Sequence, residues 1–237
     1  MTSGLVTAVC VSGPDLLAVP DRRPNRSGID KRPVEGRVAV GRLGLDGDVQ
    51  ANRKHHGGEG QAVYAYAQED ADWWAAELDR ELPAGRFGEN LRTTGLDLTG
   101  AVLGERWRVG TALFEVTACR IPCANFERFW GVPQLVRRFT AHGATGAYLR
   151  VLETGDVGAG DAVEVVDRPD HGVTVGLLFR ATTTQRRPVP AADGAGRAGG
   201  RPSWRERARG SPGDSFPGPR VRSTIGGFEQ TTSGRSR

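Results

Sequence analysis

The sequence has few cysteines and none of the common catalytic signatures. Three cysteines among 237 residues, Cys10, Cys119 and Cys123, are too few for a disulfide framework, which indicates a protein of the reducing cytoplasm. No charged and apolar leader opens the chain, and no run approaches about 18 apolar residues, so neither a secretion signal nor a membrane helix is expected. The absence of a G-x-G-x-x-G motif in a βαβ setting, and of P-loop, G-x-S-x-G, H-E-x-x-H and C-x-x-C motifs, removes support for nucleotide, serine-hydrolase and zinc chemistry.

The excess of positive charge lies in one part of the chain. The formal net charge is +4, but residues 181–237 alone carry +7, from 11 Arg and 4 acidic residues, which leaves −3 for residues 1–180. A basic protein often binds nucleic acid, but here the basicity is confined to a tail. The main part of the chain is therefore not expected to bind nucleic acid.

Short β-branched runs separated by Gly, Asp and Asn extend from residue 4 to residue 167, a pattern typical of many short strands. It predicts a mostly β fold. The expected strands are 4–12, 36–43, 61–67, 105–109, 112–119, 146–153 and 161–166, with a hairpin turn at Gly110.

Two segments have helical patterns instead. The segment 68–82 has acidic residues in its first turn and Pro83 just beyond its end. In "GVPQLVRRFTAHG", Pro133 suits the first helical position and Gly143 suits the residue after the helix, while Leu135 and Phe139 share an apolar face.

The composition changes after Arg180. Residues 181–237 contain 10 Gly, 6 Pro and only 5 residues from Leu, Ile, Val and Phe. Such a segment buries too little apolar surface to offset the entropy of ordering it, so a disordered Arg/Gly/Pro-rich tail is expected. Arg/Gly-rich tails can bind RNA, which leaves an RNA-binding arm as a minor alternative.

One cysteine stands where a strand is expected to end. In "CRIPCANF", Pro122 stops the preceding strand, which places Cys123 at the rim of the sheet. The nearby cation of Arg120 favours the thiolate, the form that attacks electrophiles and binds soft metals. Cys10 and Cys119 lie within apolar strand patterns and are expected to be buried.

Two further loops carry polar groups. In "HHGGEG", Gly57 and Gly58 permit a turn that presents N–H groups to an anion, although an ordinary hairpin turn is equally consistent, and His55 and His56 do not form a chelating pair in an extended chain. In "GRFGENL", the triplet Gly88-Glu89-Asn90 offers a carboxylate and an amide that could hydrogen-bond a heterocycle. Asp48 is a possible carboxylate partner for Glu89.

In order along the chain, "GDVQANRKHHGGEGQAVYAY", "GRFGENL", "VLGERWRVGTALFEVTACRIPC" and "DVGAGDAVEVV" resemble the MOSC domain, the family named for the C-terminal domain of molybdenum cofactor sulfurase. The similarity covers residues 1–167 and is strongest to small bacterial stand-alone members. It implies a MOSC β-barrel with a few peripheral helices over 1–167, and the start of a truncated or altered C-terminal helical segment over 168–180. Residues 181–237 would form the tail.

The resemblance also implies a function. Members of this type bind the molybdenum cofactor, a pterin dithiolene (molybdopterin), with a cysteine thiolate as a ligand to molybdenum; here that cysteine is Cys123. They resemble enzymes that detoxify N-hydroxylated bases by reducing N–OH to N–H, with electrons from a separate flavin or iron–sulfur reductase. Molybdenum ion binding and pyridoxal phosphate binding are further associations of the family.

The resemblance and the residue types together predict the site. Cys123, Glu89 and His56 are the expected catalytic residues, and Asp48 is a further candidate proton donor. The residues expected to bind the cofactor are Cys123, His56, Gly57, Gly58, Gly88, Glu89, Asn90 and Arg120. The alternative function is a non-catalytic module that carries the cofactor, or sulfur on Cys123, to another enzyme.

Overall fold

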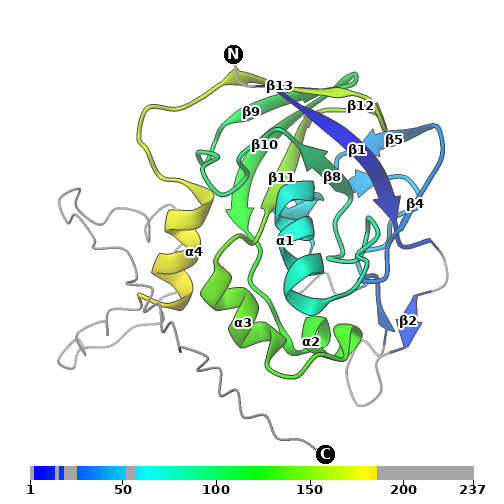
Figure 1. Ribbon diagram of the computed structural model, residues 1–237. Coiled ribbons are helices and arrows are strands. Elements are labelled where there is room, and N and C mark those ends of the chain that lie inside the picture. The colour runs from blue at the N-terminus through cyan, green and yellow to red at the C-terminus, as the bar shows by residue number, and fades with distance from the viewer. Residues whose placement is uncertain (1–2, 14–15, 19–25, 52–56, 186–237) are drawn as a thin grey trace, which may run out of the picture.

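The computed structural model of the protein describes residues 3–13, 16–18, 26–51 and 57–185 (Figure 1). His56 and the tail from residue 186 onward, on which the sequence carries expectations, lie outside the described residues.

A closed seven-stranded barrel forms the centre of the molecule and confirms the expected mostly β fold. Its strands are β1 (Ser3–Val11), β7 (Val63–Ala67), β8 (Leu91–Thr94), β9 (Arg106–Val109), β10 (Ala112–Cys119), β11 (Ala147–Glu153) and β13 (Ala162–Asp167). They are hydrogen-bonded in the order β13-β9-β10-β11-β7-β8-β1, and β1 closes the ring by pairing with β13. The described neighbours are antiparallel except β7 and β8, which run parallel and are joined by a helical crossover.

Short strands extend the barrel. β5 (Arg37–Gly41), β6 (Gly44–Leu45) and β12 (Gly155–Gly158) form a three-stranded sheet. β4 (Arg32–Pro33) pairs with β1, and β2 (Leu17–Ala18) pairs with β3 (Arg26–Ser27). The 3-10 turn η1 (Glu59–Gln61) leads into β7.

Four helices are present in the described part of the chain: α1 (Gln68–Leu78), α2 (Ala124–Trp130), α3 (Leu135–His142) and α4 (Val175–Thr183). Figure 1 shows α1, α2 and α3 gathered on one side of the molecule and α4 at the left of the view. No helix among the described residues has the length and apolar character needed to cross a membrane.

The alternation of side chains along β7 explains why the protein has two cores. All five residues of this strand are buried, since Val63, Ala65 and Ala67 face the barrel interior while Tyr64 and Tyr66 face the helices. The second core is aromatic: the ring of Phe87 stacks on Tyr66 at 4.1 Å between centroids and meets Trp130 at 4.9 Å. The outer face of β7 is therefore a second folding surface, covered by α1, α2 and α3.

The sequence located the expected strands to within one or two residues at each end. The segment 36–43, however, forms β5 of the small sheet, whereas the barrel strand β8 was not expected. Gly110 does form the β9–β10 turn, with φ of 54°, and a Cβ there would lie 2.4 Å from the carbonyl oxygen of Asp156. Only glycine fits this turn without displacing the neighbouring strand.

The helices differ more from expectation. The segment 68–82 is helical only to Leu78, because Asp79 takes a left-handed conformation with φ of 48° and Arg80 N–H bonds back to Ala75. Pro133 precedes α3 instead of starting it, whereas Gly143 ends that helix with φ of 83°, as expected. Beyond residue 167 the chain becomes helical only at Val175, where α4 begins, and this helix continues to Thr183 and passes the expected limit at residue 180.

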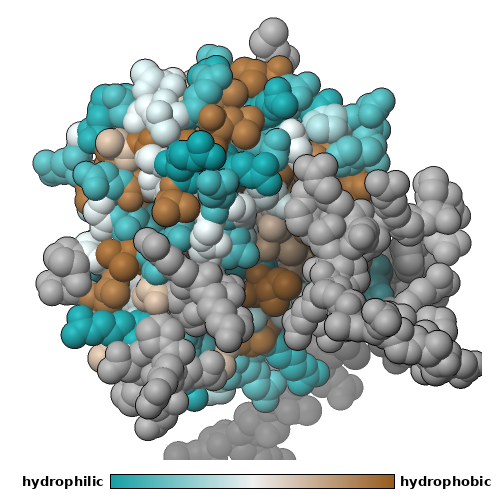
Figure 2. Space-filling view, turned by 180° about the vertical axis from the view of Figure 1, so that it is seen from behind, coloured by the Kyte–Doolittle hydropathy of each residue, from teal (hydrophilic) through white to brown (hydrophobic). Residues whose placement is uncertain are grey.

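Figure 2, viewed from behind, shows a largely polar surface in which apolar side chains form separate small groups. The exposed large apolar residues of the described chain are distributed over several elements and do not form one patch: Leu5, Leu43, Val49, Trp73, Ile121, Leu152, Val166 and Leu177.

Candidate functional site

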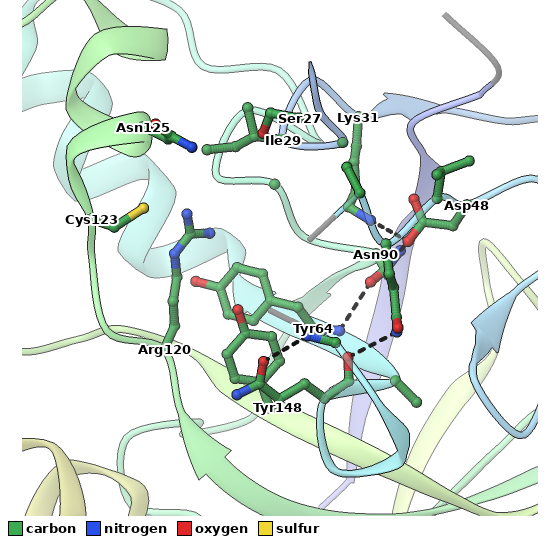
Figure 3. Close-up of a pocket in the computed structure, with 18 of the residues that line it drawn as sticks. Ser27, Ile29, Lys31, Asp48, Tyr64, Asn90, Arg120, Cys123, Asn125 and Tyr148 are labelled. Carbon is green, nitrogen blue, oxygen red and sulfur yellow. Dashed lines mark hydrogen bonds and ion pairs between the residues drawn. The ribbon is translucent and has the colours of Figure 1, made fainter. Parts of the chain in front are cut away.

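A pocket of about 390 Å³ lies on the outside of the barrel, against β7 and β11 (Figure 3). Its walls come from β3 and the segment after it, the loop that follows β6, the loop before β8 and the β10–α2 connection. The lining residues are Arg26, Ser27, Gly28, Ile29, Lys31, Asp48, Val49, Gln50, Ala51, Gly57, Gln61, Ala62, Tyr64, Gly88, Asn90, Arg120, Cys123, Asn125 and Tyr148. We call it the Cys123 pocket.

Two tyrosines form an aromatic ledge in this pocket. Tyr64 on β7 and Tyr148 on β11 are register partners, and their ring centroids lie 5.1 Å apart. The hydroxyl of Tyr64 donates to the carbonyl of Thr145 at 2.8 Å. Burial raises the pKa of both phenols, so both remain neutral near pH 7. The ledge can contact a flat organic group without adding negative charge.

Arg120 supplies a fixed positive charge beside this ledge. It is buried, donates to the carbonyl oxygen of Phe87, and lies over the Tyr64 ring at 5.1 Å and the Phe126 ring at 4.7 Å. Burial opposes its charge, but Tyr64, Tyr148 and Cys123 outweigh burial and raise the pKa of Arg120. The guanidinium therefore stays protonated.

Cys123 lies on the wall of the pocket as the residue immediately before α2. It is half-buried, and Figure 3 shows its thiol and the Arg120 guanidinium directed toward the same side of the pocket. The other two cysteines are buried, as expected, and burial raises the pKa of Cys10 to about 12 and that of Cys119 to about 11. Cys123 is thus the cysteine that lies within reach of a pocket ligand.

A charged pair occupies the opposite wall. Lys31 contacts the Oδ2 atom of Asp48, and Asp48 Oδ1 accepts the backbone N–H of Ser12 at 3.0 Å. Asn90 Nδ2 donates to Asp48 Oδ2 at 2.9 Å, while Asn90 Oδ1 accepts the N–H of Tyr64 at 3.1 Å. The Asn90 amide, expected to bind a heterocycle, is therefore largely engaged by the protein itself.

Glu89 does not line the pocket. It is fully buried, its two carboxylate oxygens accept the N–H groups of Gly85 at 2.7 Å and Phe87 at 2.9 Å, and Arg92 Nε donates to it at 2.8 Å. Its expected roles in catalysis and cofactor binding have no support in this geometry, because every one of these contacts is made within the protein. Glu89 instead holds the backbone of the loop that carries Gly88, and Gly88 is part of the pocket wall.

The Gly-rich loop is also held by its own side chains. Gly57, with φ of 129°, lines the pocket, but its N–H donates to Gln61 Oε1 at 3.0 Å. Gly58 does not line the pocket, and its N–H donates to Gln50 Oε1 at 3.0 Å. These two N–H groups are therefore not directed at an anion, in contrast to the anion-binding turn considered from sequence.

The structure thus brings together Gly57, Gly88, Asn90, Arg120 and Cys123 from three expected loops, together with Asp48, the further candidate proton donor. Sequence reasoning missed Lys31, Tyr64, Tyr148 and Asn125. Tyr64 could have been identified from "VYAYA", in which it shares one face of a strand with Tyr66, but the side that this face takes depends on barrel closure.

Two further observations bear on what the pocket can hold. The buried Oδ1 atom of Asn125, one of the lining residues, has no hydrogen-bond partner among the described residues, which leaves an acceptor for a ligand N–H or O–H. The described residues contain no group of three or more His, Cys, Asp or Glu that could hold a metal ion.

Comparisons with known proteins agree with the fold. The model of the MOSC domain family matches residues 52–164. Uncharacterized protein YflK of Bacillus subtilis is 35% identical over 160 residues, covering 68% of this chain and 72% of that protein. Protein YiiM of Escherichia coli is 34% identical over 154 residues, covering 64% and 68%.

Two other matches extend the comparison. A Gibberella moniliformis protein named reductase is 32% identical over 147 residues, which are 60% of this chain but 26% of that longer protein. The crystal structure of YiiM from Geobacillus stearothermophilus superposes with a TM-score of 0.63 at 28% identity, covering 76% of this chain and 83% of that one.

Proposed function

This chain belongs to the MOSC domain family, and on that premise we propose that it binds the molybdenum cofactor in the Cys123 pocket and reduces N-hydroxylated compounds there. The observation that carries the proposal is the position of Cys123, a half-buried thiol on the wall of a pocket that also contains Arg120 and Lys31. Thiolates are soft ligands that suit molybdenum, and the adjacent cation favours ionisation of the thiol.

The other lining residues fit the remainder of the cofactor. Arg26 and Ser27 offer a cation and a hydroxyl that suit a phosphate, and the Tyr64–Tyr148 ledge suits a flat pterin. The unpartnered Asn125 Oδ1 can accept a hydrogen bond from a ring N–H. These contacts supply the cation, donor, acceptor and aromatic surface that an anionic heterocycle requires.

The bound cofactor would supply two-electron redox chemistry, and the protein would bind and orient the substrate and deliver protons. The net change is R–NHOH + 2 e⁻ + 2 H⁺ → R–NH₂ + H₂O, with both electrons from a separate flavin or iron–sulfur reductase in the cytoplasm. The relative named reductase supports a redox role, although it shares only a quarter of its length with this chain.

Molybdenum and pterin content test the proposal directly. The wild-type protein, made in a host that synthesises the cofactor, should carry both, and Cys123→Ala should lose the metal. Cys119→Ala is the matched control, because Cys119 is buried outside the pocket and its variant should keep the metal. Equal molybdenum in Cys123→Ala and wild type would contradict the assignment of Cys123.

Turnover separates the enzyme from a carrier. With dithionite-reduced methyl viologen as electron donor, the wild-type protein should convert a hydroxylamine to the amine, and Cys123→Ala should not. Cofactor bound stoichiometrically without turnover of any N-hydroxylated compound would identify a carrier of the cofactor instead.

A further inference from the structure

The Lys31–Asp48 pair lies between the Cys123 pocket and a second hollow. Asp48 and Gln50 line both spaces. The second one, which we call the outer hollow, has a volume of about 560 Å³ and is formed by residues of β5, β6 and the loop after β6. Figure 3 shows the Lys31 ammonium directed at the Asp48 carboxylate. The pair is therefore part of the wall that separates the two spaces.

Both side chains are shielded, and the carboxylate is held in place. The side chain of Lys31 is 9% exposed and that of Asp48 is 6% exposed, so both are largely shielded from bulk water. Asp48 is fixed from the other side by Ser12 N–H at 3.0 Å and Asn90 Nδ2 at 2.9 Å. The pair can therefore exchange protons with solvent through the two spaces that Asp48 borders.

The identity of the cation matters. Of the 32 basic residues in the chain only two are lysines, Lys31 and Lys54, and all the others are arginines. A guanidinium does not release its proton in proteins, whereas a buried ammonium does. This wall of the pocket thus carries a cation that can act as an acid, unlike the other pocket cations Arg26 and Arg120.

The neighbouring charges leave the ammonium able to titrate. Burial lowers the pKa of Lys31, and Asp48, Glu89 and Cys10 only partly reverse this. Burial opposes ionisation of Asp48, but Lys31, Asn90 and Ser12 outweigh it and lower the pKa of that carboxyl. The other charged or titratable groups on the pocket wall are Arg26, Tyr64, Arg120, Cys123 and Tyr148.

We propose that Lys31 is a catalytic acid of this pocket and that Asp48 is the positioning residue through which it regains a proton from the outer hollow. The inference rests on the proposed function. As the N–O bond breaks, Lys31 gives its proton to the departing hydroxyl oxygen, which leaves as water. The two electrons come from the reductase, and the second proton comes from solvent. The side chain of Lys31, now a neutral amine, then regains its proton through Asp48.

The first test measures Lys31 itself, without cofactor or turnover. Because the chain has two lysines, protein labelled with ¹³Cε-lysine gives two lysine signals, and Lys54→Arg leaves the signal of Lys31 alone. This signal should titrate below the ordinary value of about 10.4. Asp48→Asn should move the midpoint lower still, because it removes the carboxylate that holds the proton on Lys31.

The second test follows kcat against pH in the molybdenum-loaded protein. Activity should fall at high pH along the Lys31 titration, and this limb should shift to lower pH in Asp48→Asn. Lys31→Arg keeps the charge but not the acid, so it should retain molybdenum while kcat falls by about 10²–10⁴-fold. Arg32→Gln, the neighbouring surface cation with an 81% exposed side chain, is the control and should leave kcat unchanged.

The outcomes are distinguishable. Wild-type protein without molybdenum refutes the proposed function. A loaded and active protein whose high-pH limb does not move in Asp48→Asn, while the Lys31 signal does, refutes the role of Lys31. A kcat in Lys31→Arg equal to that of the wild type also refutes the role of Lys31. If Lys31→Arg misfolds, the pH profile of Asp48→Asn still tests that role.

Discussion

Asn90 Nδ2 lies 2.9 Å from Asp48 Oδ2, so a buried amide just before β8 holds the charged wall of the pocket in place. The same amide accepts from Tyr64 N–H at 3.1 Å and donates to the Cys10 carbonyl at 3.2 Å. One side chain therefore connects the strands β1 and β7 with the loop that carries Asp48. The pocket and the barrel are parts of one hydrogen-bonded unit.

Asn90→Ala is expected to destabilise the protein by about 2–4 kcal/mol, because it leaves buried partners of three hydrogen bonds unsatisfied. Urea denaturation measures the change. Asn125→Ala is the matched control, since the Oδ1 atom of that amide has no partner among the described residues, and it should cost less than about 1 kcal/mol. Equal losses in the two variants would mean that the Asn90 contacts contribute little.

Glu89→Ala should cost about 3–5 kcal/mol, because it leaves the Arg92 guanidinium buried without its carboxylate. Both side chains are at most 1% exposed and their closest atoms lie 2.5 Å apart. The double variant Glu89→Leu/Arg92→Met should be less destabilised than Glu89→Ala, because it removes both charges. If the double variant is the less stable of the two, the unpaired charge is not the cause.

Gly28→Ala should displace the pocket wall. A Cβ at Gly28 would lie 2.4 Å from the carbonyl oxygen of Val49, and both residues line the pocket. We expect molybdenum content to fall several-fold with a modest change in melting temperature. Gly60→Ala is the control, since no atom lies within 4 Å of a Cβ there, and it should match wild type in both measurements.

Asp70→Asn should stabilise the protein at pH 8 but not at pH 4. Burial, with Glu69 and Asp97, raises the pKa of Asp70 to about 6. Between about pH 4, the ordinary value, and pH 6 the folded protein keeps a proton that the unfolded chain has released, so stability falls as pH rises through this window. Removing the charge should recover about 1–2 kcal/mol at pH 8, allowing for screening.

Denaturation of both proteins at the two pH values measures this difference. Asp72→Asn on the same helix is the matched control, because its carboxylate is exposed. A gain for Asp70→Asn that is the same at pH 4 as at pH 8 would exclude ionisation of Asp70 as its cause.

The parts of the fold that sequence predicted are those decided by local patterns. Alternating apolar residues and turn glycines located most barrel strands and the Gly110 hairpin. The helix α2 was missed because only seven residues form it and its stability comes from packing: Phe126 and Trp130 are buried in the aromatic core. Such a helix depends on partners that are distant in the sequence.

The candidate site was predictable only in part for the same reason. Cys123, Arg120 and Gly88 stand in motifs and were found. Lys31 and Tyr148 were missed because register and barrel closure bring them to the pocket, and neither is visible in a short window of sequence. The motif identified Glu89, but it did not show that the carboxylate of Glu89 points away from the pocket. The buried pair with Arg92, three residues later, determines that orientation.

The pairing of β1 with β13 has a consequence for the order of events in the cell. Ser3, Gly4 and Leu5 find their partners only at Glu164, Val163 and Ala162, so the ring closes after nearly all of the described chain has left the ribosome. Tyr148, on one wall of the pocket, is also synthesised late. The ring, and with it the pocket wall that carries Tyr148, is therefore completed late in synthesis, and under the proposed function the cofactor would find its complete site only after β13 has paired with β1.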